Sequence, residues 1–251
     1  MSLLPLLLAV LQYPHPHPHS QRPDIRAGLD TIYAGDFPAA VHYFQTLAVK
    51  DTLDPAPLIF QASAYIWWAS AKDSDDFATA RIDSLLDAAI TRARADSADF
   101  WLATALGYRA REKDLHHHGL AAGKDAKAMQ DAYTRVLAAD SACEDCYLGL
   151  GVYQYGLARA GGLARFFAKI IGLGSGNADT GIADLRRVAT RGDLARVEAA
   201  WVLAAALVRE ADRDQSRGPE FRAQARALVV ELAAKYPGNP VFQRFMTEVP
   251  P

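Results

Sequence analysis

The segment Gly28–Ala48 (GLDTIYAGDFPAAVHYFQTLA) limits the fold more than any other, because it reads as two helices joined by a tight turn. The apolar residues at positions 37, 40, 44 and 47 share one helix face. Gly35 and Asp36 supply the turn, since glycine accepts a positive φ, and Pro38 fits the first turn of the next helix. The segment therefore predicts a helical hairpin whose apolar face must be covered by a neighbour.

Further hairpins follow along the chain. The small residues Ala64, Gly107, Gly151 and Ala205 align with Gly28 as points where the two helices of a pair touch. Second helices repeat the apolar spacing at 129, 132, 136 and 139, and again at 225, 229 and 232. We therefore predict five hairpins and a short terminal helix after Asn239-Pro240. The expected helices are 22–34 with 37–50, 57–71 with 75–95, 97–113 with 120–139, 143–158 with 177–191, and 194–212 with 218–236.

These hairpins resemble the tetratricopeptide repeat (TPR), a helix-turn-helix unit with small residues where its two helices meet. The units are longer than the standard repeat of about 34 residues. The resemblance implies an all-α, TPR-like α-solenoid with a short C-terminal capping helix, in which residues 22–251 form a single domain. It also implies a scaffold for a protein or peptide partner, because the first helices of such arrays line a concave groove.

The C-terminal part of the chain is similar to two further groups. The stretches YLGLGVYQYGLAR, NADTGIADLRRVATRG and ARALVVELAAKYPGNPVF look like the C-terminal half of uncharacterised exported bacterial TPR proteins. They also look like the mitochondrial outer-membrane protein family tied to inclusion-body clearance. Both resemblances imply a non-enzymatic scaffold, and they carry over no catalytic residue.

Equivalent positions on the first helices predict the lining of the groove. Spacings of i, i+3 or i+4, and i+7 keep each set on one helix face. The sets combine aromatic rings with one cation, which are residue types that dominate binding hot spots. Aromatic residues are also common in helical cores, so burial is the alternative for each of them. The predicted partner-binding residues are Gln61, Tyr65 and Trp68, then Trp101, Thr104, Tyr108 and Arg111, and then Leu148, Val152 and Tyr155.

Cys143 and Cys146, the two cysteines of the chain, leave several interpretations open. Ser141 and Glu144 match a capping box, which predicts a helix start that places Cys143 in the first turn. The helix dipole would there lower a thiol pKa and favour redox chemistry. However, no strand precedes the motif, as it does in thioredoxin-type sites, and no second CxxC completes a zinc site. A structural role is favoured, either as apolar packing in a reducing compartment or as a local disulfide in an exported protein.

Residues 1–21 differ in character from the rest of the chain. Residues 3–11 (LLPLLLAVL) form an apolar run that is too short to span a bilayer and fits the core of a secretory signal. No lysine or arginine precedes this run, and no typical cleavage motif follows it. The histidines at 15, 17 and 19 alternate with prolines, as expected of a linker. The pattern favours an exported, periplasmic protein, with a cytoplasmic location as the alternative.

Three other segments have features that resemble a membrane-binding, metal-binding or phosphate-binding site. Residues 163–171 place apolar side chains beside Arg165 and Lys169. Such a helix either extends the core, which we favour, or lies on a membrane surface. The histidines at 116–118 are interpreted as a loop, because adjacent helical positions point about 100° apart. The stretch GLGSGN at 172–177 lacks the ending of a phosphate loop and is interpreted as a connection.

Charge and motifs exclude several classes of function. The 27 lysines and arginines are balanced by 29 acidic residues, so no basic surface for nucleic acid is expected. The sequence offers no Ser/His/Asp set and no HExxH motif, and it predicts no enzymatic activity, cofactor or metal. We expect a non-enzymatic scaffold that binds a protein or peptide. The alternatives are a thiol-redox protein using Cys143 and Cys146, and a membrane-surface adaptor using residues 163–171.

Overall fold

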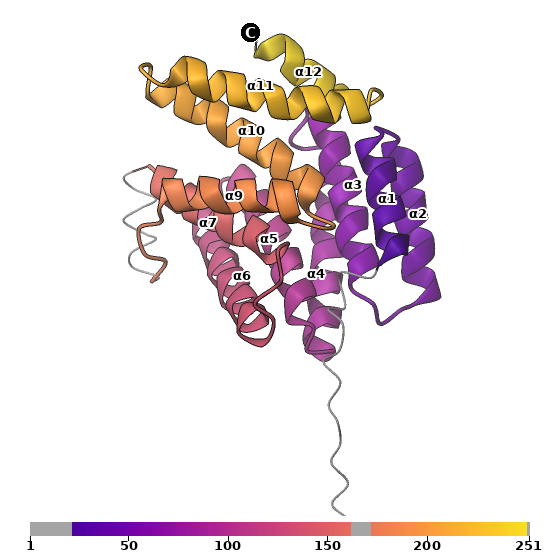
Figure 1. Ribbon diagram of the computed structural model, residues 1–251. Helices are drawn as coiled ribbons and strands as arrows, with labels where there is room; N and C mark the ends of the chain where they lie inside the picture. Colours follow the sequence, from indigo (N-terminus) through magenta and orange to yellow (C-terminus); the bar gives the residue numbers. More distant parts are fainter. Residues whose placement is uncertain (1–21, 162–171, 250–251) are drawn as a thin grey trace, which may run out of the picture.

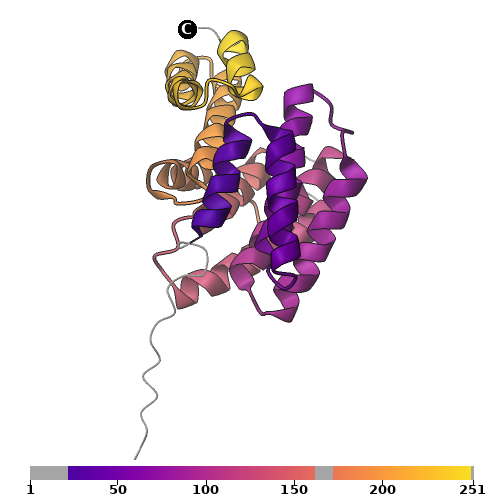
Figure 2. The same ribbon diagram turned by 90° about the vertical axis from the view of Figure 1, so that its right-hand side faces the viewer.

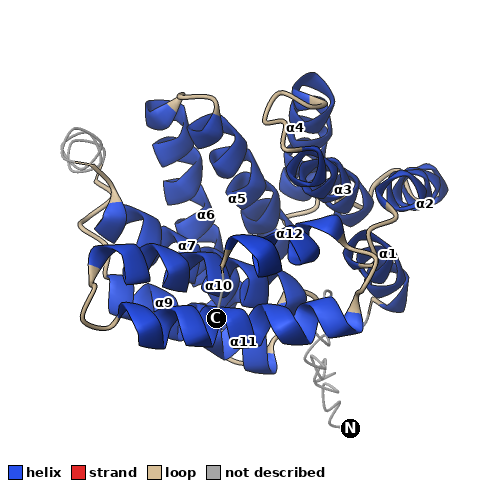
Figure 3. Ribbon diagram, turned by 90° about the horizontal axis from the view of Figure 1, so that it is seen from above, coloured by secondary structure: helices blue, strands red, loops and turns tan. Residues whose placement is uncertain are grey.

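The computed structural model describes residues 22–161 and 172–249, and α-helices account for 78% of them. These ranges hold eleven helices and no β-strand. Figures 1 and 3 show how the helices are arranged. This helix content is far above the globular average of about a third. The prediction of an all-α fold built from adjacent helix pairs is therefore confirmed.

The helices follow one another as hairpins with short connections. Most of the predicted ranges differ from the observed ones by one or two residues at each end, and the largest differences are the starts of α4 and α7. The bounds are α1 Pro23–Tyr33 with α2 Phe37–Lys50, α3 Ala56–Lys72 with α4 Thr79–Ala95, α5 Asp99–Leu115 with α6 Gly119–Ala139, α7 Cys146–Arg159 with α9 Ala178–Arg191, α10 Arg196–Arg213 with α11 Gly218–Lys235, and the terminal α12 Pro240–Glu248.

The pairs stack so that their first helices touch one another. Helices α1, α3, α5 and α7 contact in succession, and each also contacts the second helix of its own pair. Helix α10 then packs on α9 and α11, so the last helices cross one end of the stack. In Figure 1 they lie above the other helices, and Figure 2 shows the same arrangement from the side.

Polar caps and glycines fix where the helices begin and turn. Gly35 has φ +89° in the turn between α1 and α2, a conformation that suits a residue without Cβ. The side chain of Asp36 then accepts a hydrogen bond from the backbone N–H of Ala39 at the start of α2. Asn177 caps α9 in the same way through the N–H of Thr180. These local signals explain why the turns could be read from the sequence.

Small residues lie at the helix contacts of several pairs. A Cβ on Gly28 would fall 2.3 Å from the ring of Phe44, so α1 and α2 meet there. A Cβ on Gly151 would lie 3.0 Å from the carbonyl oxygen of Gly181, which confirms the predicted contact between α7 and α9. The prediction for the fifth pair is wrong, because Ala205 is exposed and Ala204 is buried instead. Alanine is frequent along α10, so its sequence pattern does not fix the helix phase.

The end of the helical chain packs against its beginning. The side-chain amide of Asn239, in the turn between α11 and α12, donates to the backbone carbonyl of Tyr33 at 3.0 Å. In the same place Gly35 and Gly238 approach so closely that a Cβ on Gly35 would lie 2.5 Å from the Gly238 oxygen. Phe242 of α12 also packs edge-on against Trp67 of α3. An open solenoid keeps its first and last units apart. In this structure, by contrast, residues at the end of the described chain contact α1 and α3.

Two predicted segments lie outside the described residues. These are the N-terminal segment 1–21, with its apolar run and its histidines, and the amphipathic segment 163–171. Among the helices that the structure does describe, none has the length and apolar character needed to cross a membrane.

Candidate functional site: an interhelical cavity and the cysteine pair

The described helices border a cavity of about 1370 Å³. It opens between α5, α6, α7 and α10, and α3 adds part of one wall. Its apolar lining includes the rings of Trp67, Tyr108, Tyr133 and Trp201 together with Met129. This volume exceeds that of a typical small-molecule pocket, which is about 300–1,000 Å³. We call this space the interhelical cavity.

Several charged side chains also border the interhelical cavity. Arg111 and Asp114 belong to the C-terminal half of α5, and Arg209 is an exposed residue of α10. Arg159 of α7 is paired with Glu210. Glu198 of α10 lies nearer the aromatic rings, where its Oε2 accepts a hydrogen bond from the Tyr108 hydroxyl at 2.5 Å. The cavity therefore combines an apolar interior with a few polar groups, as binding sites commonly do.

Half of the predicted groove residues line this cavity. Those of α5 lie at Thr104, Tyr108 and Arg111, and those of α7 at Leu148 and Val152. Val152 is 44% exposed, so its side chain is open to a ligand. The sequence alignment of the third and fourth hairpins thus correctly predicted residues that lie on one surface.

The other predicted residues lie elsewhere. Gln61 and Trp101 are buried, and the Tyr155 hydroxyl donates to the carboxylate of Glu210 at 2.9 Å. Tyr65 and Trp68 stack on each other, with ring centroids 6.3 Å apart. Helix α3 instead presents Ile66, Trp67 and Ser70 to the cavity.

The physical reason is that α3 is buried around most of its circumference. Residues 56–64, 66 and 67 are all buried. A helix that is apolar on every side carries no amphipathic pattern from which its facing can be read. Sequence reasoning also missed the contributions of α6 and of Glu198 and Trp201 on α10. The fifth hairpin had been aligned on Ala205, and no local signal marks these residues as neighbours of α5.

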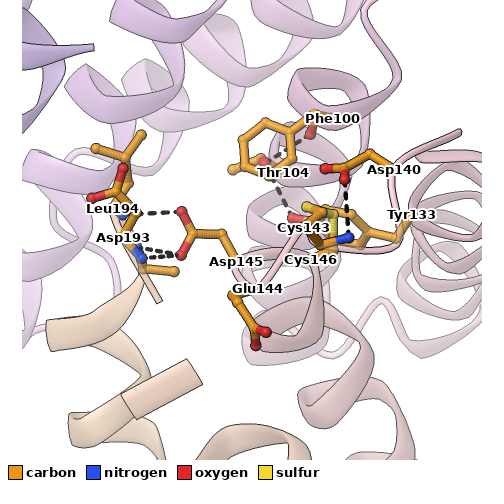
Figure 4. The surroundings of a disulfide bond; sticks show 12 residues. Phe100, Thr104, Tyr133, Asp140, Cys143, Glu144, Asp145, Cys146, Asp193 and Leu194 are labelled. Carbon is orange, nitrogen blue, oxygen red and sulfur yellow. Dashed lines mark hydrogen bonds between the residues drawn. A yellow bond between two sulfur atoms is a disulfide. The ribbon is translucent and has the colours of Figure 1, made fainter. Parts of the chain in front are cut away.

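Cys143 and Cys146 form a disulfide in the turn between α6 and α7, shown in Figure 4. The predicted capping box is not formed, because α7 begins at Cys146 and has no side-chain cap. Glu144 instead accepts two hydrogen bonds from Arg187 of α9, at 2.6 and 2.9 Å. A charged partner from a distant helix therefore outweighs the local cap, and Cys143 lies before the helix and outside its first turn.

Asp145, between the two cysteines, ties this turn to the start of α10. Its carboxylate accepts hydrogen bonds from the backbone N–H groups of Asp193, Leu194 and Ala195, at 2.7, 3.0 and 3.4 Å. Figure 4 shows this side chain pointing away from the disulfide toward residues 193 and 194. Burial raises the pKa of the Asp145 carboxyl, and the three N–H donors act in the opposite direction. Asp145 thus has a structural function that its position within a CxxC motif does not indicate.

The disulfide itself is shielded from solvent. Cys143 is 1% exposed and Cys146 is 0% exposed. Thiol–disulfide exchange requires an attacking thiolate to reach one of the sulfurs, so this arrangement favours a structural link over a redox site.

We expect the disulfide to resist reduction while the protein is folded. Treatment with excess dithiothreitol followed by iodoacetamide should alkylate the cysteines slowly in native buffer and rapidly in urea, as measured by mass spectrometry. Replacing both cysteines with alanine should cost about 2 kcal/mol, because the closed loop is short. Fast alkylation of the folded chain would instead support the redox interpretation.

The described residues contain no group of three or more histidine, cysteine or acidic side chains placed to hold a metal ion. His116–His118 form the turn between α5 and α6, with φ +64° at His117. No protein-family model matches the sequence, and neither does any curated protein or solved structure with which the chain was compared.

Proposed function

We propose that the chain is a non-enzymatic scaffold of the tetratricopeptide-repeat type, which binds a segment of a protein or peptide in the interhelical cavity. The observation that carries this proposal is the composition of the cavity walls. Helices α3, α5, α7 and α10, each the first of its hairpin, line it together with one second helix, α6. A concave surface built from the first helices of stacked hairpins is how repeat proteins form their binding faces.

The lining suits a peptide with apolar side chains. Aromatic rings provide large contact area at low cost in side-chain entropy. Gly156 borders the same space and is exposed, and a Cβ added there would meet nothing within 4 Å, so its backbone is accessible to a ligand. The charged residues Arg111, Asp114 and Arg209 lie around it, where they would favour some sequences over others.

The proposal is tested by placing a charge inside the cavity. Val152→Glu introduces a carboxylate on an apolar wall, and the exposed side chain leaves room for the change. Val230→Glu is a matched control, since Val230 is 45% exposed on α11 and does not line the cavity. Peptides selected from a random display library against the full chain should bind Val152→Glu at least about tenfold more weakly, a loss of roughly 1.4 kcal/mol.

Fluorescence anisotropy with the selected peptides would measure this difference. Binding to Val230→Glu should match that of the unmodified protein. Equal binding to both variants would place the site on another surface, and a library that yields no binder would contradict the proposal.

A further inference from the structure

One corner of the interhelical cavity places a carboxylate among aromatic rings. Glu198 belongs to α10, and the rings of Trp67, Tyr108 and Trp201 border the same space. The ring centroids of Trp67 and Trp201 are 6.1 Å apart. Glu198 and Trp201 stand three residues apart on α10, which places both on the helix face that lines the cavity. We call these four residues the acidic aromatic corner.

The carboxylate of Glu198 is half-buried in this corner. Tyr108 is its one hydrogen-bond donor among the described residues, and that bond goes to Oε2. Oε1 therefore receives no hydrogen bond from this part of the chain. Burial raises the pKa of Glu198, since the apolar surroundings disfavour the ionised form. A carboxylate held in such surroundings is stabilised by a cation that supplies both charge and donors.

The charge of Arg111 lowers the pKa of Glu198. Its guanidinium, however, donates to the carboxylate of Glu112, which is buried. Arg111 thus faces two carboxylates and forms a hydrogen bond with the one next to it in sequence. The described residues provide no ion pair for Glu198.

We propose that the acidic aromatic corner receives a basic side chain of the bound peptide, a lysine or an arginine. The carboxylate of Glu198 would pair with its charge, and the rings of Trp67, Tyr108 and Trp201 would contact its alkyl chain and its cationic head. Aromatic faces attract cations, most strongly for tryptophan. This inference rests on the proposed function, because it assumes that a peptide occupies the cavity.

The test compares peptide libraries that differ at one fixed position. Three libraries share the same random flanking residues and carry lysine, glutamine or glutamate at the centre. The full chain should bind the lysine library at least about tenfold more tightly than the glutamine library, and the glutamate library most weakly. Equal binding of the lysine and glutamine libraries would overturn the inference and leave the proposed function intact.

Glu198→Gln isolates the carboxylate. Glutamine keeps an oxygen that can accept from Tyr108, so the fold should be preserved, which circular dichroism can verify. This variant should lose the preference and bind the lysine and glutamine libraries equally. An unchanged preference for lysine would show that another group recognises the cation. If no library binds the original chain, both the inference and the proposed function fail.

Discussion

Replacing Gly181 with alanine should destabilise the protein by about 1–3 kcal/mol, although alanine normally favours a helix. A Cβ on Gly181 would lie 2.7 Å from the carbonyl oxygen of Gly151 and 2.7 Å from the backbone nitrogen of Tyr155. Both atoms belong to the backbone of α7, so they cannot move aside as a flexible side chain could. Helices α7 and α9 would have to separate, with loss of contact along the pair.

Gly156 provides the matched control for this prediction. It lies on α7, and a Cβ added there would meet nothing within 4 Å. Gly156→Ala should therefore leave stability unchanged or raise it by up to about 1 kcal/mol, through helix propensity alone. Urea denaturation followed by circular dichroism measures both variants. Similar midpoints for the two proteins would mean that α7 and α9 do not approach as closely as described.

Replacing Asp145 with alanine should cost about 2–4 kcal/mol. The backbone N–H groups of Asp193, Leu194 and Ala195 would lose their shared acceptor. A buried donor left without a partner carries its full desolvation cost. The loss is reduced because the same change removes a buried charge, whose burial already raises the pKa of Asp145.

Two neighbouring substitutions make this test specific. Glu144→Ala removes the ion pair with Arg187, which is partly exposed, and should cost no more than about 1 kcal/mol. Asp145→Asn keeps one acceptor oxygen and should fall between the original protein and Asp145→Ala. Chemical denaturation would order the three variants. A loss for Glu144→Ala as large as that for Asp145→Ala would show that the ion pair, and not the carboxylate of Asp145, joins the two turns.

Much of the helical architecture could be predicted because its signals are local. The turn at Gly35 and Asp36 depends on residues next to one another, and so does the cap at Asn177. Period-3.6 spacing of apolar residues then identifies the second helices. The contact at Gly151 was predictable for the same reason, since a small residue in a regular pattern marks a close approach of helices.

The features that could not be predicted depend on contacts between residues that are distant in the sequence. The capping box at Ser141 was replaced by the pairing of Glu144 with Arg187, which no window around residue 141 contains. Half of the candidate site was predicted, because the alignment of Gly107 with Gly151 selected residues of α5 and α7 that line the cavity. The same alignment failed for α3, which is buried around most of its circumference. Glu198 joined the site only through its hydrogen bond to Tyr108 on another hairpin.

The contact between Asn239 and Tyr33 joins segments that are far apart in the sequence and are therefore synthesised at different times. As the chain leaves the ribosome, α1 emerges long before Tyr236 and Asn239, which contact Tyr33. The surface around Tyr33 therefore remains exposed, or protected by a chaperone, until these residues have been made. Once formed, the closure removes the free ends from which an open array would fray. Loss of either end then withdraws support from the other, so the helices are expected to unfold together and not hairpin by hairpin.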